Sequence, residues 1–324
     1  MRLLVTGGAG FIGSHFVRTL LTDGYPGLEG AEVTVFDKLT YAGNLANLTA
    51  VEQHPRYRFA KGDIVSAEDL DAVVPGHDAI VNFAAESHVD RSITGASTFV
   101  LTNVLGAQQV FEAALRHGIL RVVHVSTDEV YGSIPVGEWT EEHILEPNSP
   151  YSAAKAGADL LARAYVVTYG LNLSVTRCSN NYGPYQYPEK VIPLFVTNLI
   201  DGQNVPLYGD GLNVRDWLHV DDHCRGIALV LTDGGPGEFY NIAGGRELTN
   251  KELTALLLEA CDAGWDRVDY VEDRLGHDRR YALDFGKLAA LGYQPRVGFE
   301  DGLAETVQWY RDNRSWWEPL KNQA

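Results

Sequence analysis

The chain opens with RLLVTGGAGFIG, residues 2–13, and this stretch decides the fold. Arg2–Thr6 is an apolar, β-prone run, and a helical pattern follows at 14–21. Between the two, the glycines fit G-x-x-G-x-x-G counted from Gly7 and G-x-G-x-x-G counted from Gly8. Either spacing lets backbone N–H groups approach a pyrophosphate at a helix N-terminus. Taken alone, the same glycines also fit an ordinary tight turn between a strand and a helix.

The next strand supports the nucleotide-binding alternative. Val33–Phe36 is a second apolar run, and Asp37 stands at its carboxyl end, 24 residues after Gly13. A carboxylate at this position accepts hydrogen bonds from ribose hydroxyls and repels a 2′-phosphate, so NAD is favoured over NADP. The neighbouring Lys38 weakens that preference slightly.

Further apolar runs at Asp78–Phe83, Arg121–Ser126 and Leu173–Arg177 alternate with amphipathic stretches at Phe99–His117 and Tyr151–Tyr169. Alternation of this kind predicts an α/β fold, a Rossmann-type doubly wound parallel sheet with helices on both faces. Ligands of such sheets bind outside the carboxyl ends of the strands.

Beyond about residue 180 the chain becomes turn-rich and aromatic. Tyr240–Ala243 is predicted as a further strand of the sheet, whereas Val191–Asp201 and Thr249–Ala263 are predicted as helices of a cap. We expect an NAD-binding domain at 1–180, with later segments near 215–245 returning to it, and a smaller, mixed α/β C-terminal substrate-binding lobe mainly at 181–324.

Composition and charge narrow the classes of function. The net charge of −17 argues against nucleic acid or an anionic membrane surface as a partner. The 324 residues, 45% hydrophobic, provide core material for two lobes. No stretch approaches ~20 continuous apolar residues, and Met1 leads directly into a strand, so we expect no membrane span, no signal peptide and a cytoplasmic location. Cys178, Cys224 and Cys261 lack metal-ligand spacing, and we expect buried reduced thiols.

One group of residues indicates chemistry. Tyr151 and Lys155 lie four apart on a predicted helix, so they share a face, and the ammonium can lower the pKa of the phenol. Such a tyrosine can remove an alcohol proton while hydride leaves for a nicotinamide. Thr127, Asp128 and Glu129 reach the same edge of the sheet. Alcohol oxidation needs only one base and one hydride acceptor, so the two adjacent carboxyls predict a second reaction.

Basic residues gather in Gly- and Pro-containing loops of the second half, where they can converge on a diphosphate. They are Lys190, Arg215, Arg274, His277, Arg279 and Arg280. For at least half of them, solvated surface charge is an alternative interpretation.

Seven stretches carry a resemblance that covers nearly the whole chain. They are TGGAGFIGS (6–14), FDKLTYAGN (36–44), AAESHVDRS (84–92), STDEVYG (126–132), YSAAK (151–155), RCSNNYGP (177–184) and RDWLHVDD (215–222). Together they resemble the extended short-chain dehydrogenase/reductases and, within that superfamily, the dTDP-glucose 4,6-dehydratases. Thr127-Asp128-Glu129 is the narrower mark, because related decarboxylases and GDP-mannose dehydratases usually carry serine at the Asp128 position and epimerases lack the Glu. No motif position departs from the dehydratase pattern.

The resemblance implies a mechanism acting on dTDP-glucose. Tyr151, activated by Lys155, takes the C4 hydroxyl proton as hydride passes to NAD, and Thr127 hydrogen-bonds the same oxygen. Glu129 then removes the C5 proton while a protonated Asp128 donates to the departing C6 hydroxyl. Hydride returns to C6, and no metal is needed.

The resemblance also implies which residues bind the two ligands. Those expected at NAD are Gly7, Gly10, Phe11, Ile12, Gly13, Asp37, Lys38, Leu39, Thr40, Asp63, Ile64, Phe83, Ala84, Ala85, Ser87, Thr102, Tyr151, Lys155 and Asn181. Those expected at the nucleotide sugar are Ser87, Thr127, Asp128, Glu129, Asn180, Lys190, Val191, Pro206, Leu207, Tyr208, Arg215, Asn250, Arg274 and His277. The arginines are expected on the diphosphate and Pro206–Tyr208 near the thymine.

Alternatives stay open at two residues and for the function. Arg215 also fits a salt bridge between the lobes, and Asn250 also fits an N-cap for a helix that begins at Lys251. A UDP-sugar epimerase or decarboxylase is the nearer alternative function, and a non-catalytic NAD-sensing protein is the remoter one.

The two long predicted helices carry apolar residues on more than one face. They include Val100, Val104, Val110, Leu160, Leu161, Val166 and Val167. A helix that is apolar beyond one stripe has a second partner, and the family pairs these helices across a two-fold axis. We therefore expect a homodimer with a four-helix interface.

Overall fold

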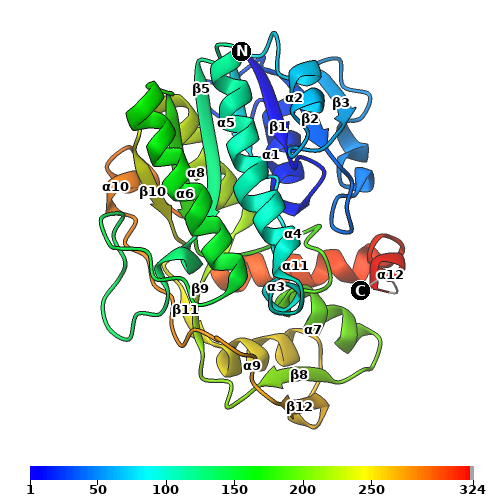
Figure 1. Ribbon diagram of the computed structural model, residues 1–324. Coiled ribbons are helices and arrows are strands. Elements are labelled where there is room, and N and C mark those ends of the chain that lie inside the picture. The colour runs from blue at the N-terminus through cyan, green and yellow to red at the C-terminus, as the bar shows by residue number, and fades with distance from the viewer. Residues whose placement is uncertain (322–324) are drawn as a thin grey trace.

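A seven-stranded parallel sheet forms the centre of the computed structural model, which describes residues 1–321 (Figure 1). Its strand order is β10-β6-β5-β4-β1-β2-β3. The strands are β1 (Arg2–Thr6), β2 (Glu32–Asp37), β3 (Tyr57–Lys61), β4 (Ala79–Asn82), β5 (Arg121–Thr127), β6 (Leu173–Cys178) and β10 (Phe239–Ile242). The order reverses direction between β1 and β4, which is the switch point where doubly wound sheets bind ligands. The predicted fold class is confirmed.

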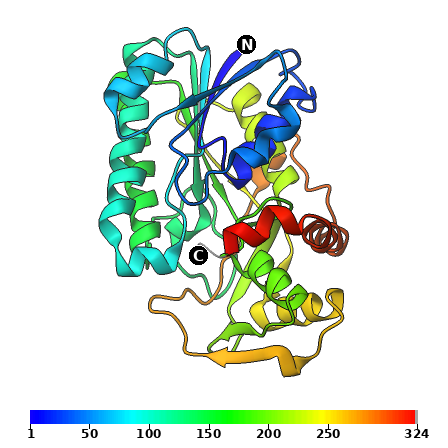
Figure 2. The same cartoon turned by 90° about the vertical axis from the view of Figure 1, so that its right-hand side faces the viewer.

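Helices cover both faces of this sheet, as Figure 2 shows from the side. One face carries α1 (Phe11–Leu21), α8 (Val220–Asp233) and the short α10 (Gly286–Ala289), with η1 (Leu45–Val51) against α1. The other carries α2 (Ala67–Val73), α5 (Ala107–Arg116) and α6 (Pro150–Tyr169). Central strands β4, β5 and β6 are buried along their whole length, as expected for parallel strands covered on both sides.

The stretch predicted as a helix at Phe99–His117 is helical, but its winding changes along its length. After α3 (Val89–Thr94), helix α4 (Ala96–Phe99) continues without a break into a π-helical segment, η2 (Val100–Gly106), and then into α5. A Cβ on Gly106 would lie 2.7 Å from Ile64 Cδ1, so the end of η2 packs closely against the loop after β3. Apolar periodicity predicts a helix here, but it does not show where the winding widens.

A smaller lobe lies below the large sheet in Figure 1 and is mixed, as predicted. Its strands are β7 (Asn180–Tyr182), β9 (Val214–His219) and β11 (Glu247–Thr249) in one sheet, and β8 (Val205–Tyr208) with β12 (Val268–Val271) in another. Its helices are α7 (Val191–Ile200), α9 (Asn250–Ala260), η4 (Trp265–Arg267), α11 (Phe299–Asp312) and α12 (Arg314–Lys321). A separate apolar core holds the lobe together.

The chain passes between the lobes more than once. After β9, helix α8 packs on the large sheet and β10 extends that sheet beside β6, before β11 returns to the smaller lobe. Cys178 and Cys224 are buried free thiols as expected, whereas Cys261 is partly exposed. Within residues 1–321, no helix has the length and apolarity to cross a membrane.

Candidate active site

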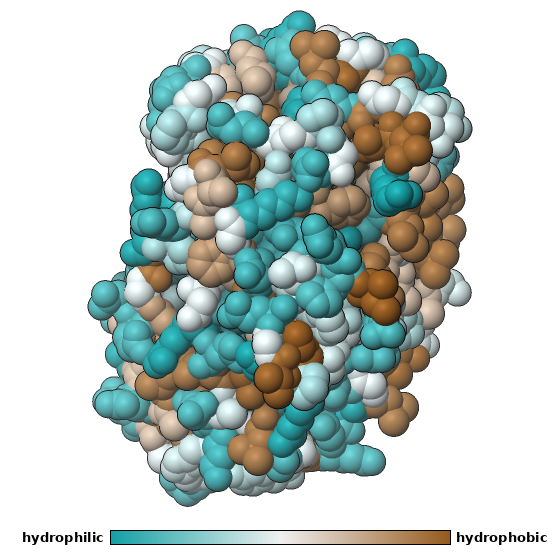
Figure 3. Space-filling view, turned by 90° about the vertical axis from the view of Figure 1, so that its left-hand side faces the viewer, coloured by the Kyte–Doolittle hydropathy of each residue, from teal (hydrophilic) through white to brown (hydrophobic). Residues whose placement is uncertain are grey.

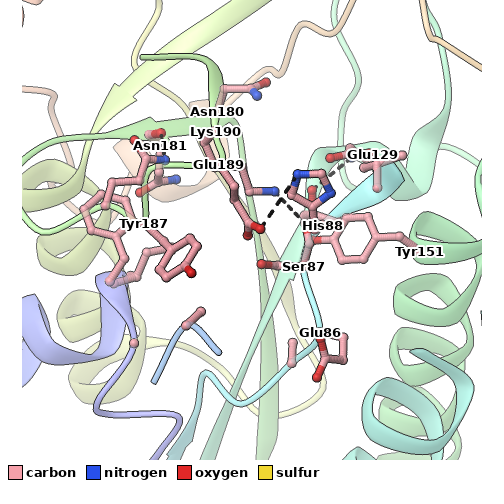
Figure 4. A pocket seen from close by; sticks show the side chains of 18 of the residues that line it. Glu86, Ser87, His88, Glu129, Tyr151, Asn180, Asn181, Tyr187, Glu189 and Lys190 are labelled. Carbon is pink, nitrogen blue, oxygen red and sulfur yellow. Dashed lines mark hydrogen bonds and ion pairs between the residues drawn. The ribbon is translucent and has the colours of Figure 1, made fainter. Parts of the chain in front are cut away.

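A cavity of about 590 Å³ lies between the carboxyl edge of the large sheet and the smaller lobe. Every residue predicted for catalysis and for the nucleotide sugar lines it, and so does every residue predicted for the cofactor except Leu39. Residues predicted from the sequence alone therefore lie together around this cavity in the folded chain. Figure 4 shows part of this wall, with Tyr151 and Glu129 on the side of the large sheet and Asn180 and Lys190 facing them.

The glycine turn forms one end of the cavity. Gly7 has φ of +67°, and a Cβ added there would lie 2.6 Å from Ala84 N, at the end of β4. A Cβ on Gly13 would lie 2.8 Å from Gly8 Cα. Side chains are therefore excluded where the backbone N–H groups at the start of α1 face the cavity, and this shape fits a bound pyrophosphate.

Asp37 closes the same end of the cavity from the end of β2. Its two carboxylate oxygens accept hydrogen bonds from Ala9 N at 3.0 Å and from Leu39 N at 2.8 Å. Burial raises the pKa of this carboxyl, and the two backbone donors oppose that rise. Two backbone donors thus fix the carboxylate at this end of the cavity, and its contact with a ribose stays a prediction. Leu39 contributes one of these N–H groups, and its side chain packs against the core instead of lining the cavity, so its contact with the cofactor stays a prediction.

Helix α6 brings Tyr151 and Lys155 to the cavity. Ser149 and Ser152 form a capping box at its N-terminus, and Pro150 occupies a position in the first turn where its missing N–H costs nothing. The first turn therefore places Tyr151 at the edge of the cavity, and Lys155 follows one turn later on the same face. Lys155 Nζ donates to Val125 O at 2.7 Å, which fixes the ammonium against β5.

The two carboxyls stand on a short 3₁₀ helix, η3 (Asp128–Tyr131), that begins where β5 ends. Thr127 caps this helix, because its hydroxyl accepts from Glu129 N at 3.3 Å and donates to Asp128 Oδ1 at 3.2 Å. Asp128 is buried, and its Oδ2 has no hydrogen-bond partner within residues 1–321. A free carboxyl oxygen facing the cavity is available to a ligand.

The surroundings of Asp128 and Glu129 affect the pKa values of the two carboxyls differently. Burial, followed by the negative charge of Glu129, raises the pKa of Asp128 well above its usual range. Burial also raises the pKa of Glu129, but the positive charges of Arg274, Lys190 and Arg215 oppose that rise. Asp128 is therefore the group that keeps its proton, and Glu129 is the group that the surrounding cations favour as an anion.

One expectation about the base is wrong. The spacing of Tyr151 and Lys155 predicted that the ammonium lowers the pKa of the phenol, yet burial and the charge of Glu129 raise the pKa of Tyr151 well above its usual value. Burial also lowers the pKa of Lys155 to about 8, although Asp159 opposes this shift. A helical spacing fixes which residues share a face, but it does not show how deeply that face is buried.

Cations of the smaller lobe face the two carboxyls across the cavity. Lys190 Nζ donates to Ser87 O at 2.6 Å, a contact drawn in Figure 4. Arg215 lies 4.2 Å from the centre of the Tyr281 ring and donates to Asp278 O at 2.9 Å. Arg274 Nε is buried without a hydrogen-bond partner in the described part of the chain. Arg274 Nη1 lies 3.7 Å from Asp90 Oδ1, whereas the described residues place no carboxylate in an ion pair with Lys190 or Arg215. The three cations keep donors that can bind a diphosphate.

Other predicted cations lie elsewhere. Arg279 pairs with Asp210 at 2.9 Å and Arg280 with Glu247 at 2.6 Å, both away from the cavity wall. Arg279 is therefore a surface charge, whereas Arg280, whose side chain is 20% exposed, forms a partly buried ion pair away from the cavity. His277 lines the cavity, and burial lowers its pKa to about 4, so it is a neutral side chain at pH 7.

The two residue alternatives are also decided. The described residues 1–321 contain no carboxylate paired with Arg215, so it forms no salt bridge between the lobes. Asn250 is not an N-cap, because α9 begins at Asn250 itself and Thr249 caps it with Glu252. Threonine three residues before glutamate is the capping-box pattern, so the signal was present in the sequence.

Some residues that shape the cavity were missed. Asn103 of η2 makes two hydrogen bonds with the backbone of Glu86, at 2.8 and 2.9 Å, and thereby fixes the loop that follows β4. Tyr281 supports Arg215, and Glu189 lines the wall beside Lys190. None of the three stands at the end of a predicted strand, so the sheet-edge rule gave no signal for them. Among residues 1–321, no group of His, Cys, Asp and Glu is arranged to hold a metal ion.

A Rossmann sheet with a Tyr-x-x-x-Lys pair, facing a second lobe that places Lys190, Arg215 and Arg274 on the cavity wall, defines the class of the extended short-chain dehydrogenase/reductases. The model of the GDP-mannose 4,6 dehydratase family matches residues 4–306. A dTDP-glucose 4,6-dehydratase of Streptomyces niveus is 62% identical over 99% of this chain and 96% of its own length. DesIV, a dTDP-glucose 4,6-dehydratase of Streptomyces venezuelae solved with NAD and TYD bound, is 65% identical, with a TM-score of 0.98 over 99% of this chain and 100% of that one.

An epimerase is more distant. The UDP-glucose 4-epimerase of Thermotoga maritima, solved with UDP-glucose, is 32% identical, with a TM-score of 0.89 over 97% of this chain and 100% of that one. The chain belongs to the dTDP-glucose 4,6-dehydratases, a family of NAD-dependent hydro-lyases. The resemblance inferred from the seven motifs is confirmed.

Proposed function

We propose that this chain uses bound NAD to convert dTDP-glucose into dTDP-4-keto-6-deoxyglucose and water. The observation that carries the proposal is the pair of buried adjacent carboxyls with opposite surroundings, Asp128 without a partner at Oδ2 and Glu129 among three cations. Elimination of water needs an acid and a base that are present at the same pH. An oxidation alone needs only one base, so this pair supports dehydration.

The residues present fit the cofactor. The turn from Gly7 to Gly13 excludes side chains and suits a pyrophosphate, and Asp37 is held where it can accept from a ribose. Bound NAD supplies the hydride acceptor for C4 and the hydride donor for C6. Lys155, fixed by Val125 O, stands beside this part of the cavity and supplies a positive charge below its pKa of about 8.

Three residues act on C4. Tyr151 takes the proton of the C4 hydroxyl, and the Thr127 hydroxyl, which also caps η3, orients the same oxygen. The raised pKa of Tyr151 means that its phenol holds a proton tightly once it has gained one, so it is a strong base when ionised. Lys155 lies one turn further along the same face of α6, fixed by its hydrogen bond to Val125 O.

The two carboxyls act on C5 and C6. The ketone formed at C4 acidifies C5, and Glu129 removes the C5 proton. Asp128 donates its proton to the C6 hydroxyl, which leaves as water. Glu129 then returns its proton to C5 as C6 gains a hydride, so the sugar loses one water and undergoes no net change in oxidation state.

The product distinguishes the alternatives. We would incubate the purified protein with dTDP-glucose in deuterated water and analyse the sugar nucleotide by mass spectrometry and NMR. The expected product has lost one water and carries deuterium at C5. A 4-epimer without loss of water would support an epimerase, loss of carbon dioxide from a UDP-uronic acid would support a decarboxylase, and no conversion of any sugar nucleotide would support a sensor. A parallel incubation with UDP-glucose measures how strictly the protein requires thymine as the nucleotide base of its substrate.

The assembly and location form part of the same proposal. The outer layer formed by α5 and α6 in Figure 2 coincides with apolar surface along the right-hand margin of Figure 3. Exposed side chains on η2 and α6 include Val100, Leu101, Leu160 and Val167, each more than half exposed. Other predicted interface residues are more buried, and Val110 belongs entirely to the core. We propose a homodimer through these helices.

We also propose that residues 1–180 act mainly as the cofactor-binding domain, with 215–245 returning to it, and that 181–324 hold the nucleotide sugar. A cytoplasmic location suits three cysteines that form no disulfide with one another.

A further inference from the structure

A cluster outside the catalytic residues joins three segments of the cavity wall. Tyr41 belongs to the loop after β2, Arg91 to α3, and Glu189 to the turn before α7. Tyr41 and Glu189 are 148 residues apart in the sequence. The neighbours of Tyr41 in the chain, Thr40 and Ala42, both line the cavity, as does Glu189 itself. The cluster therefore closes the wall between the predicted cofactor residues and the smaller lobe.

Each member of the cluster contacts the other two. The Tyr41 hydroxyl donates to Glu189 Oε1 at 3.0 Å. Arg91 lies 3.2 Å from the second carboxylate oxygen, Glu189 Oε2, and its guanidinium stacks 3.9 Å from the centre of the Tyr41 ring. The Tyr187 ring also meets the Tyr41 ring edge-on, with 5.4 Å between the ring centres. We call Tyr41, Arg91 and Glu189 the clasp.

Burial makes these contacts strong. The Glu189 side chain is 6% exposed, whereas that of Arg91 is 40% exposed, so the clasp runs from the cavity wall to the surface. His88 lies 3.8 Å from Glu189 Oε2, as Figure 4 shows, but burial lowers its pKa to about 4, so it is neutral at pH 7 and does not compensate the carboxylate. The charge of Glu189 thus depends on Arg91, on the Tyr41 hydroxyl and on the neighbouring Lys190.

We propose that the clasp of Tyr41, Arg91 and Glu189 holds the cofactor-binding loop against the smaller lobe and sets the rate at which NAD leaves the site. This inference rests on the proposed use of NAD. A redox-neutral cycle needs the same cofactor molecule at both hydride transfers, so premature release would leave the sugar oxidised and the protein without cofactor. Residues that slow the release of NAD, without contacting the sugar, would keep the same cofactor molecule in the site for both hydride transfers.

The loop after β2 is the natural element for such control. It carries Lys38 and Thr40 at the cavity wall, and Gly43 N donates to Thr40 O at 3.1 Å in a tight turn around Tyr41. A loop held only by its own turn opens easily, whereas a hydrogen bond to a buried carboxylate at its tip ties it to another lobe. Opening of the loop then requires Tyr41 to lose both its hydrogen bond to Glu189 and its stacking contact with Arg91.

The experiment measures cofactor exchange in the absence of any sugar. The purified holoprotein is mixed with excess isotope-labelled NAD, and mass spectrometry of the protein-bound NAD gives the exchange rate. Tyr41→Phe removes only the hydroxyl, and Glu189→Gln removes the charge, so the milder variant keeps the test valid if the other folds poorly. Tyr270→Phe is the matched control, because Tyr270 is 56% exposed on β12.

Exchange of bound NAD is expected to become roughly tenfold faster or more in each variant. Each substitution removes a hydrogen bond to a charged group that exists only when the loop is closed, so it destabilises the closed state and leaves the open state unchanged. The double variant should exchange no faster than the faster single one, since both break the same contact. With excess NAD, kcat of Tyr41→Phe should equal that of the unaltered protein, whereas dilution without NAD should inactivate the variant sooner. Exchange within about twofold of the unaltered protein in both single variants would overturn the clasp. An unaltered protein that bound no NAD would overturn the proposed function as well, and this is measured first.

Discussion

Asp128→Asn separates the oxidation from the elimination. The amide keeps the size of the carboxyl and can still accept from Thr127 Oγ1, which lies 3.2 Å from Asp128 Oδ1. It cannot give up a proton to a departing hydroxyl. Tyr151, Lys155 and Glu129 are unchanged, so oxidation at C4 and proton removal at C5 keep their bases. The variant should therefore stall after oxidation.

The magnitude follows from the role. A positioned general acid contributes roughly 10²–10⁴ in rate, so loss of water should slow by that factor while the first hydride transfer continues. Because Asp128 is buried and its Oδ2 has no partner in residues 1–321, solvent is poorly placed to replace the acid. The upper part of this range is expected.

The assay is a single turnover of the holoprotein with dTDP-glucose, followed by the absorbance of NADH and by mass spectrometry of the quenched sugar. Asp128→Asn should accumulate reduced cofactor with little dehydrated product, whereas Glu129→Gln should suppress exchange of the C5 hydrogen with solvent deuterium. Asp266→Asn, on the exposed η4, should behave like the unaltered protein. If Asp128→Asn bound the sugar nucleotide normally but formed no NADH at all, Asp128 would belong to the oxidation step and the assignment would be refuted.

Four other outcomes are expected. NAD should copurify and turnover should need no added reductant, so stoichiometric release of NADH during complete reactions would contradict the cycle. Gly13→Ala should lose bound NAD and about 1–3 kcal/mol of stability, because its Cβ would lie 2.8 Å from Gly8 Cα, whereas Gly298→Ala, with its nearest contact at 3.5 Å, should retain its NAD in the same assays. Leu101→Glu, at a half-exposed position of η2, should shift a dimer to a monomer in sedimentation at micromolar protein, and a monomeric unaltered protein would contradict the interface. Burial raises the pKa of Asp128, so this carboxyl destabilises the folded state increasingly as pH rises from the usual pKa of an aspartate toward neutral pH. Asp128→Asn cannot ionise, so its free energy of unfolding relative to the unaltered protein should increase over that range in denaturant titrations, and a difference that stayed constant or decreased would contradict the burial argument.

Much of the large sheet was predictable from the sequence. Central parallel strands are buried on both faces, so each appears as a short apolar run, and the runs at 121–126 and 173–177 match β5 and β6 to within one residue. The carboxyl ends of these strands share one edge, and this rule alone placed Asp37 and Thr127 in the same cavity. The position of a residue at the end of a strand follows from its neighbours in the chain, so it can be predicted from the sequence.

What the sequence did not reveal depends on contacts between distant segments. Gly106, at the end of the π-helical η2, packs closely against Ile64, and burial in the folded chain raises the pKa of Tyr151. Arg274 and Arg280 stand in the same kind of loop, yet the first faces the cavity and the second pairs with Glu247. Composition cannot separate these two arginines, because a partner 33 residues away decides between them.

The residues proposed as acid and base of the elimination, Asp128 and Glu129, depend on different lobes although they are adjacent in the chain. Asp128 keeps its proton because η3 buries it at the edge of the large sheet, beside the charge of Glu129. Glu129 is favoured as an anion by Lys190, Arg215 and Arg274, and all three belong to the smaller lobe. Burial alone would protonate both carboxyls, and a pair with the same protonation state could not act as acid and base together. The cations of the smaller lobe that can hold a diphosphate thus also oppose the rise in the pKa of Glu129, and this second effect supports the proposed role of Glu129 as the base.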